Sequence, residues 1–408
     1  MPAASGFRNS AFRNKAAFAG AGVVKCVRRA DAPVGLLAVQ ASDAAIADAG
    51  LTRTDIDGVV CGTSMPADRA ASVLRPGFDL VNCEFLTDQM GLEPTWTLDT
   101  SFFSSAVAYA VMAVASGVAT CVLVNRSVHN PAGRYHQFDA AGASGRSQWT
   151  APYGFVGWVA GMAMSYMEYQ QRYGARREHM ATQVLQNHRN VQQIPEAYWY
   201  GKELTFDEYM SARMIAAPLC LFDNDIPVDG SGSFIVTTAD RARDLPNKPV
   251  YITSWAKVRN QKRSTWALPG TLGALDDYYD RGFDLADRLW RNSGWRPDDV
   301  QVVQLYDGFA METWYWLETL GFCPQGEAWR FIQDGRIAPD GEFPLNTGGG
   351  SSGWGRFHGV VQVLESYLQL SDRAGGRQLA RAETAISTFG DPAHDIAEVL
   401  LYAADPAA

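Results

Sequence analysis

The chain has 408 residues, of which 47% are hydrophobic and 19% charged, and its formal net charge is −9. This is the composition of an ordinary globular protein long enough for two large cores, which excludes an intrinsically disordered chain. The apolar runs are far shorter than the ~20 residues that a membrane-spanning helix needs, and the negative charge argues against a nucleic-acid partner. We therefore expect a cytoplasmic protein with no membrane span.

Strand and helix patterns alternate through the first half of the chain. In chain order they predict a strand over 17–24, a helix over 36–49, a strand over 56–61, a helix over 106–116 and a strand over 119–125. The last of these helices is apolar on every side and rich in alanine and serine, so it should be fully buried against close neighbours. This alternation predicts a layered α/β fold with a largely parallel sheet.

The pattern changes over about 129–215, where aromatic residues are frequent and a long helical run covers 157–173. We interpret this stretch as an inserted subdomain, after which a strand over 232–237 returns the chain to the first core. The second half holds strand patterns at 250–255, 300–305, 383–389 and 397–403, and helix patterns at 285–293, 311–320 and 360–370. The similar element order predicts two duplicated halves, 1–247 and 248–408.

Six cysteines occur along the chain, and no two of them form a CxxC pair. Because structural zinc sites usually take their cysteines from such pairs, we expect no metal site in this chain. We expect reduced thiols instead, mostly buried, as is typical of a cytoplasmic protein.

Five ordered motifs resemble the thiolase superfamily, most closely its branch of sterol-carrier-protein thiolases and bacterial steroid side-chain aldolases. They are the segment 96–106, the segment 211–219 with 223–230, the segment Gln304-Leu305-Tyr306-Asp307-Gly308-Phe309, the segment 320–323 with 326–327, and the loop 344–350. The resemblance covers nearly the whole chain from about residue 16. It implies an α/β fold of two duplicated βαβαβ halves in five αβαβα layers, with an inserted loop subdomain.

The chain departs from the thiolase pattern at the catalytic positions. Thr100 stands where thiolases carry the nucleophilic cysteine, Arg356 replaces the histidine of their Gly-His-Pro motif, and 387–390 lacks their second cysteine. A threonine hydroxyl with no adjacent base is a poor nucleophile. Tyr306 replaces the histidine of the His-Asp-Cys-Phe motif, as in the aldolases, and His358 is kept as it is in them. The resemblance therefore implies chemistry without an acyl-enzyme.

Four residues are candidate catalytic groups. Tyr306 lies at the end of an apolar strand, where α/β folds place catalytic groups, and is either a general acid/base or a core tyrosine. Arg356 either favours the Tyr306 phenolate and stabilises an enolate, or pairs with a carboxylate. Asp307 either caps the following helix or takes part in the chemistry, and His358 either relays protons or is a packed imidazole.

A second set of residues is expected to bind the substrate. It comprises Thr100, Ser101, Asn346, Gly348, Gly349 and Gly350. The backbone amides of the first two, at the start of a buried helix, are suited to hold an oxyanion, and the glycines allow a close backbone approach. The aromatic residues between 153 and 169 either form an apolar wall for a bulky acyl group or pack in the core.

The resemblance implies an aldolase, a carbon–carbon lyase that cleaves a β-hydroxyacyl-CoA thioester of a steroid side chain. The products would be a ketone or aldehyde and acetyl-CoA or propionyl-CoA. Two alternatives remain open, namely a non-catalytic acyl-CoA or lipid-binding subunit and a Claisen-type acyltransferase. CoA would enter only as part of the substrate, and no cofactor is expected in this chain.

The resemblance also implies an assembly. Thiolase-like subunits pair through their first-half sheets, so we expect a homodimer with two-fold symmetry. A small zinc-ribbon/OB-fold protein would add to it and form a heterotetramer, with zinc only in that partner.

Overall fold

The computed structural model describes residues 12–63, 74–130, 148–149, 151–155, 158–258, 275–391 and 397–407. Nine strands form one mixed sheet in the order β3-β2-β4-β7-β1-β8-β11-β10-β9. The first-half strands are β1 (Ala16–Val23), β2 (Gly58–Gly62), β3 (Trp96–Thr100), β4 (Cys121–Val128) and β7 (Gly230–Thr238). The second-half strands are β8 (Val250–Lys257), β9 (Val302–Gln304), β10 (Thr384–Phe389) and β11 (Glu398–Ala403).

The sheet differs from the expectation in two respects. The two β layers of the expected αβαβα arrangement are not separate sheets. They are joined where β1 pairs with β8 through Ala17–Tyr251 and Phe18–Val250. The sheet is also not largely parallel. Its strands are parallel at β3–β2, β2–β4 and β10–β9 and antiparallel at the other junctions. The reason is local at the β10–β11 junction. β10 ends at Phe389 and β11 begins at Glu398, and a connection this short suits an antiparallel pair, since a parallel pair needs a crossover of a dozen or more residues.

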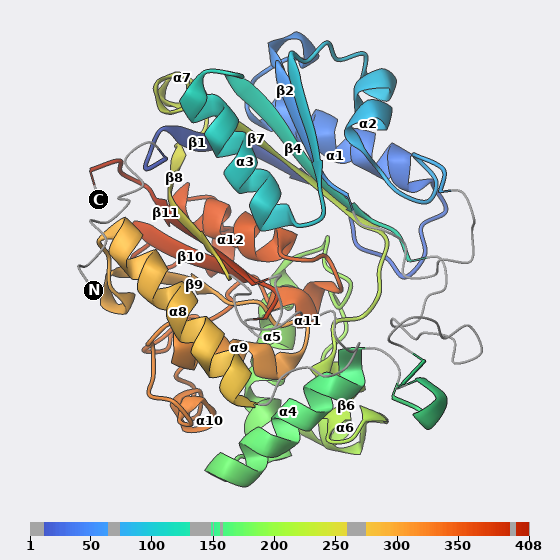
Figure 1. Ribbon diagram of the computed structural model, residues 1–408, viewed down its shortest axis with the longest axis vertical. Coiled ribbons are helices and arrows are strands. Elements are labelled where there is room, and N and C mark those ends of the chain that lie inside the picture. Colours follow the sequence, from blue (N-terminus) through green and yellow to red (C-terminus); the bar gives the residue numbers. More distant parts are fainter. Residues whose placement is uncertain are drawn as a thin grey trace.

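Helices cover both faces of the strands in the five expected layers (Figure 1). α1 (Val34–Asp48) and α2 (Cys83–Met90) lie on the outer face of the first half. α8 (Leu275–Ser293) and α9 (Ala310–Thr319) lie on the outer face of the second half. Between the halves lie α3 (Phe103–Ser116) and α12 (Val360–Leu370), in one core with strands from both sides.

The central helix α3 is buried, as its composition predicts. It begins at Phe103, and its small residues Ser104, Ser105 and Ala106 are almost fully shielded from solvent. It ends at Gly117, which adopts the left-handed conformation (φ 75°) common after helix C-termini. Three positions depart from the expectation, because Met112 is 41% exposed and Ala115 and Ser116 at the end of the helix are exposed as well.

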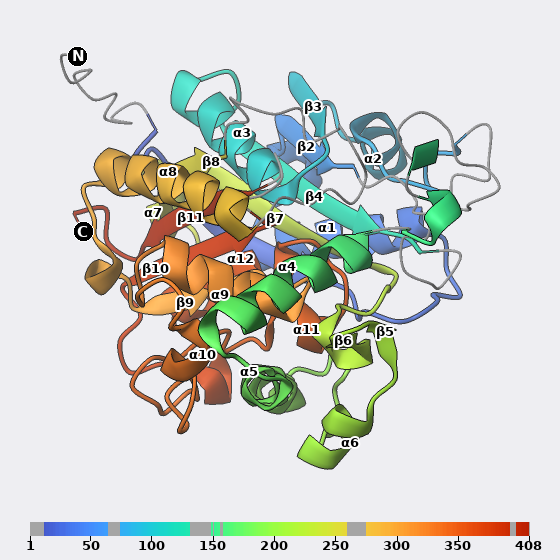
Figure 2. The same ribbon diagram turned by 60° about the horizontal axis from the view of Figure 1, so that its bottom comes forward.

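The segment between β4 and β7 packs onto the second half of the protein. Its helices are α4 (Trp158–Tyr173), α5 (Arg177–Asn190) and α6 (Phe206–Ser211), next to the short hairpin of β5 (Met214–Ala216) and β6 (Leu219–Cys220). In both views α4 and α5 lie near α9 and the helix α11 (Gly350–Trp354) (Figures 1 and 2). Residues 131–147 of the expected insert lie outside the described part of the chain.

Two of the insert's aromatic residues belong to the core rather than to a substrate wall. Tyr166 and Tyr169 are fully buried, and their ring centroids lie 5.8 and 5.3 Å from that of Trp314. The Tyr169 hydroxyl donates to Glu318 over 2.5 Å. Tyr153, by contrast, is 85% exposed.

His188 of α5 gives a prediction about stability and pH. It is 2% exposed, packs against Trp199 and Phe222, and neither ring nitrogen has a hydrogen-bond partner among the described residues. Burial lowers the pKa of His188 to about 4. The folded protein therefore keeps this imidazole neutral while the unfolded chain, with a pKa of about 6.5, protonates it.

Stability should consequently fall as pH drops from about 6.5 towards 4, because the unfolded state then binds one more proton. At pH 5 the loss assigned to this group is about 2 kcal/mol, relative to pH 7.5 or above. The His188→Leu variant should lack that part of the loss, which urea unfolding at pH 7.5 and pH 5 measures. An equal pH dependence in wild type and variant would contradict the assignment.

In the part of the chain that the structure describes, no helix combines the length and the hydropathy needed to cross a membrane. All six cysteines are buried and unbridged, which confirms the expectation of mostly buried thiols without disulfide bonds.

Candidate active site

The candidate residues of the second half follow β9. Asn346 holds the chain just beyond that strand, since its side-chain oxygen accepts from the Leu305 backbone N–H (2.7 Å) and its side-chain nitrogen donates to the Leu305 carbonyl (2.9 Å). The Asn346 carbonyl accepts from Asn190 of α5 over 2.9 Å. The described contacts therefore give Asn346 a positioning role, while its expected contact with substrate stays a prediction.

Asp307 is fully buried and accepts five hydrogen bonds. The backbone N–H groups of Ser351 and Ser352 donate to it over 2.6 and 3.1 Å, so Asp307 caps the first turn of α11. The Ser352 hydroxyl, Asn187 and Gln362 donate to it as well. Burial raises the pKa of Asp307, and these donors oppose that effect.

Asp307 therefore does not cap the helix that follows it. That helix, α9, has its N-terminal end closed by Glu312, which accepts from the Phe309 backbone N–H over 2.8 Å. Both oxygens of Asp307 are instead engaged by α5, α11 and α12. Asp307 thus holds the loop that carries Arg356 and His358.

The glycines of the loop at 348–350 are required by protein contacts. A Cβ atom on Gly349, where φ is 83°, would come within 2.1 Å of Val191. A Cβ atom on Gly350 would lie 2.4 Å from an Asp307 oxygen, and one on Gly348 would lie 2.9 Å from Glu365. The loop therefore packs tightly between α5, Asp307 and α12, and the expected approach of its backbone to a ligand stays a prediction.

Tyr306 is 7% exposed and packs edge-on against Phe389, with ring centroids 5.0 Å apart. Its backbone N–H donates to the Thr388 hydroxyl over 2.7 Å, which fixes the residue between β9 and β10. Burial raises the pKa of Tyr306 well above its usual value, and the carboxylates of Asp225 and Glu312 add to this effect.

The expectation that Arg356 lowers the pKa of Tyr306 overall is therefore wrong, because the pKa is raised. Arg356 does act on Tyr306 in the expected direction and lowers its pKa, but burial and the nearby carboxylates outweigh that effect. Tyr306 is consequently a proton donor at neutral pH. A proton acceptor, if the reaction needs one, must be another group.

Arg126 of β4 is a site residue that the sequence analysis missed. It is 3% exposed, and its guanidinium donates to the carbonyls of Gly62 (2.8 Å) and Ser101 (2.7 Å). It also lies 2.7 Å from Nδ1 of His358. Burial lowers the pKa of Arg126 to about 10, with Tyr306 opposing and Arg356 reinforcing this effect. Arg126 thereby joins two first-half loops to the second half.

His358 lies between two guanidinium groups. Arg126 contacts its Nδ1, and Nε of Arg356 lies 3.0 Å from its Nε2. A neutral imidazole has one acceptor nitrogen and a protonated imidazole has none, whereas guanidinium groups only donate. Only one of the two arginines can therefore donate a full hydrogen bond to His358. His358 also has φ 50°, a conformation that is uncommon outside glycine and often found at functional sites.

Phe389 brings the two halves together at the site. Its ring lies 5.0 Å from Tyr306, 5.8 Å from Phe102 and 6.2 Å from His358, measured between centroids. Phe102 directly precedes α3, so it comes from the loop that also holds Thr100 and Ser101. Phe389 thus contacts two candidates of the second half and, from the first half, the residue that follows Ser101, and it lies in the segment that lacks the second cysteine of thiolases.

Thr100 ends β3, and its carbonyl accepts from the Thr63 backbone N–H over 2.6 Å. We expect Thr100→Ala to keep at least about a tenth of the wild-type rate, because only the backbone is needed at this position. Steady-state kinetics on the purified variant measures this. A loss of more than ~10³-fold with unchanged folding would instead assign catalysis to the hydroxyl.

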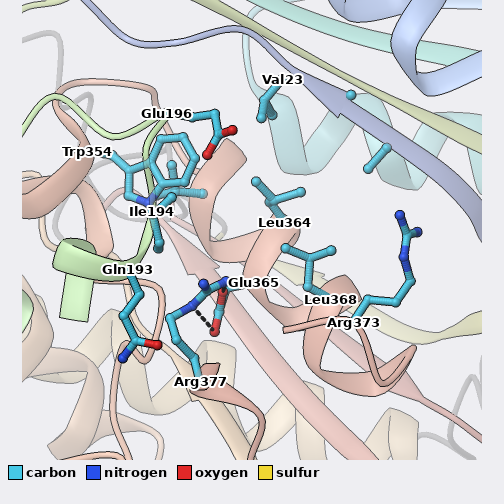
Figure 3. A pocket seen from close by; sticks show the side chains of 13 residues that line it. Val23, Gln193, Ile194, Glu196, Trp354, Leu364, Glu365, Leu368, Arg373 and Arg377 are labelled. Atoms are coloured by element: carbon cyan, nitrogen blue, oxygen red, sulfur yellow. Dashed lines mark hydrogen bonds and ion pairs between the residues drawn. The ribbon is translucent and has the colours of Figure 1, made fainter. Parts of the chain in front are cut away.

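A cavity of about 230 Å³ lies apart from these residues, between β1, α12 and residues 193–196 (Figure 3). Val23, Ile194, Leu364 and Leu368 form apolar walls, and the ion pair of Arg377 with Glu365 lies at one end. None of the described residues that line it is a candidate catalytic or substrate-binding residue.

The layered sheet with a central buried helix and a tyrosine at a strand end defines a thiolase-like protein. Residues 284–395 match the thiolase C-terminal domain-like family. The 17-hydroxy-3-oxo-4-pregnene-20-carboxyl-CoA lyase of Mycobacterium tuberculosis is 33% identical over 82% of this chain and 86% of that protein. The steroid side-chain-cleaving aldolase of Thermomonospora curvata is 30% identical over 86% of this chain and 89% of that protein.

A solved structure agrees with the sequence comparisons. The structure of an Ltp2-ChsH2(DUF35) aldolase, 27% identical, superposes with a TM-score of 0.83 and covers 96% of this chain and 99% of that chain. The chain therefore belongs to the thiolase superfamily, in the branch of the sterol carrier protein 2 thiolases.

Proposed function

We propose that this protein is an aldolase that cleaves the carbon–carbon bond of a β-hydroxyacyl-CoA thioester without an acyl-enzyme. The observation that carries the proposal is a buried, protonated Tyr306 near Arg356, in a site where Thr100 replaces the nucleophile. Retro-aldol cleavage needs a base, an oxyanion site and a proton donor but no nucleophile. The base we propose is His358, which lies between Arg126 and Arg356.

The proposed reaction begins when His358 takes the proton of the substrate's β-hydroxyl group. The oxygen forms a carbonyl as the bond between the α- and β-carbons breaks, and the electron pair passes to the thioester as an enolate. Tyr306 donates its phenolic proton to the α-carbon, which gives the shorter acyl-CoA. The phenolate regains a proton from His358, so the site returns to its starting state.

The remaining candidates stabilise charge in this scheme. Arg356 lowers the energy of the transient Tyr306 phenolate, since it is the cation that already lowers the pKa of that group. The backbone amides of Thr100 and Ser101 hold the enolate oxygen. Arg126 and Asp307 are positioning residues that hold the loops on either side of the substrate.

The substrate we propose is a steroid side-chain thioester, because the two relatives described above are named for such chemistry. The acyl product is acetyl-CoA or propionyl-CoA. CoA is part of the substrate, and the retro-aldol step itself uses no cofactor.

The proposed aldolase activity is tested with 17-hydroxy-3-oxo-4-pregnene-20-carboxyl-CoA, the thioester in the name of the Mycobacterium tuberculosis relative. We expect a ketone and a shorter acyl-CoA in equal amounts, detected by mass spectrometry, and ~10²–10⁴-fold slower formation of both by the Tyr306→Phe variant. Binding of this thioester without turnover, in the presence of a DUF35 partner, would favour the lipid-binding alternative. A stable acyl adduct on the protein would favour the Claisen-type acyltransferase.

The assembly we propose is a homodimer joined by β3 and completed by a DUF35 protein with a zinc ribbon and an OB fold. β3 is an edge strand of the sheet, and Thr97 and Asp99 on it are exposed. A DUF35 partner is supported by the name of the similar aldolase structure. We place the enzyme in the cytoplasm, because six unbridged cysteines are typical of a reducing compartment.

A further inference from the structure

Two cysteines and one aspartate converge beside the first-half loops of the site. Cys61 and Asp99 are paired neighbours near the ends of β2 and β3, and Cys83 is the first residue of α2. One ligand atom from each of the three residues lies within 4.8 Å of the other two. We propose that Cys61, Cys83 and Asp99 bind a thiophilic divalent cation of the Zn²⁺ type, a site separate from the proposed catalytic residues.

The cluster is reached from one side. Both cysteines are buried, at 1% and 3% exposure, whereas Asp99 is exposed on the single subunit, on the edge strand that we propose as the dimer contact. The Cys83 thiol donates to the carbonyls of Val59 (3.5 Å) and Leu98 (3.3 Å), contacts that a bound cation would replace. One oxygen of Asp99 accepts from the Cys83 backbone N–H (2.9 Å) and from the Thr63 hydroxyl (3.1 Å). Its other oxygen has no hydrogen bond to a described residue, so it can coordinate a metal while the first oxygen keeps α2 in place.

The ligand types suit such a cation. Two thiol groups and one carboxylate lie together, and Zn²⁺ deprotonates its thiol ligands on binding and releases their protons. Two sulfurs at ~2.3 Å and one oxygen at ~2.0 Å from the metal fit groups that lie this close together, with water as the fourth ligand.

The cation would tie β2, β3 and α2 together next to the active-site loops. Gly62, one residue beyond Cys61, accepts from Arg126, and Thr100 follows Asp99. This differs from the expectation that the chain holds no metal. That expectation rested on the absence of a CxxC pair, whereas these ligands come from three separate elements that only the fold brings together.

Cobalt binding to the untagged, reduced protein tests the proposal. We expect one Co²⁺ per chain, with a thiolate-to-cobalt charge-transfer absorption and visible bands of tetrahedral intensity, and displacement of the cobalt by one equivalent of Zn²⁺. Cys61→Ser and Cys83→Ser should abolish the charge-transfer absorption. Cys121→Ser, which changes an equally buried cysteine of the same half, is the matched control and should leave it unchanged.

Asp99→Asn keeps the fold intact because its oxygen can still accept from Cys83 and Thr63. It should weaken Zn²⁺ binding by at least ~10-fold, since it removes the charged ligand oxygen. Failure of the wild-type protein to bind cobalt, or the same spectrum in wild type, Cys61→Ser and Asp99→Asn, would overturn the proposal. Neither result bears on the proposed aldolase reaction.

Discussion

Replacing Tyr306 by phenylalanine should lower kcat by ~10²–10⁴-fold and leave KM nearly unchanged. The substitution removes only the hydroxyl, which we propose as the donor of the proton that ends the reaction. The ring keeps its edge-on contact with Phe389, so packing and stability should change little. Steady-state kinetics and thermal unfolding of the same preparation measure both effects.

Two further variants sharpen this test. Tyr315→Phe is the matched control, because Tyr315 is a buried tyrosine of α9 that packs against Tyr278 away from the candidate residues. It should keep near wild-type activity. Arg356→Met should slow turnover alone but add little in the Tyr306→Phe background, if the two residues act as one unit. A fully active Tyr306→Phe enzyme would remove Tyr306 from the mechanism.

The Arg126→Lys variant should lose activity by ~10²-fold although it keeps the positive charge. Lysine has no planar fork and cannot reach the carbonyls of Gly62 and Ser101 and Nδ1 of His358 at once. Each buried carbonyl left unpaired costs about 1–3 kcal/mol, so the melting temperature should also fall. Kinetics and thermal unfolding measure the two effects.

A second measurement distinguishes a positioning role of Arg126 in catalysis from a role in stability alone. The loss in Arg126→Lys should fall on kcat with KM nearly unchanged, because Arg126 holds His358 rather than the substrate. Arg241→Lys is the control, since Arg241 pairs with Asp55 near the surface of the same half. A wild-type kcat in the folded Arg126→Lys variant would assign this arginine to stability alone.

The sequence predicted the layers of the fold, and it marked candidate site residues such as Tyr306 in the second half. The small, apolar composition of 103–116 marks a buried helix, and Tyr306 at a strand end marks a candidate catalytic group. Both inferences rest on local patterns, which a sequence shows directly. The direction of the strands was predicted less well, because the short connection from β10 to β11 leads to an antiparallel pair.

Arg126, Asn187 and Phe389 were not predicted as site residues, because their role depends on contacts that only the fold creates. Arg126 lies in a strand whose other residues are uncharged, and a lone charge in a buried strand is the one signal that could have marked it. Asn187 and Phe389 gave no such signal, since an asparagine in a helix and a phenylalanine in a strand are ordinary. Their importance lies in contacts with Asp307 and Tyr306, more than eighty positions away in each case, which only the fold creates.

The net direction of the pKa shift at Tyr306 was predicted wrongly. An arginine near a tyrosine suggests a lowered pKa, and Arg356 does act in that direction. Burial of the phenol and the carboxylates of Asp225 and Glu312, which are distant in sequence, reverse the outcome. The sign of a pKa shift therefore depended on burial, which the sequence did not reveal for this residue.

A single turnover in deuterium oxide, followed by mass spectrometry of both protein and products, tests whether cleavage proceeds without an acyl-enzyme and with Tyr306 as the proton donor. We expect a shorter acyl-CoA with one deuterium on its α-carbon, from the exchanged Tyr306 hydroxyl, and a protein of unchanged mass at every time point. A transient increase of the protein mass by an acyl group, or a product without deuterium, would contradict it.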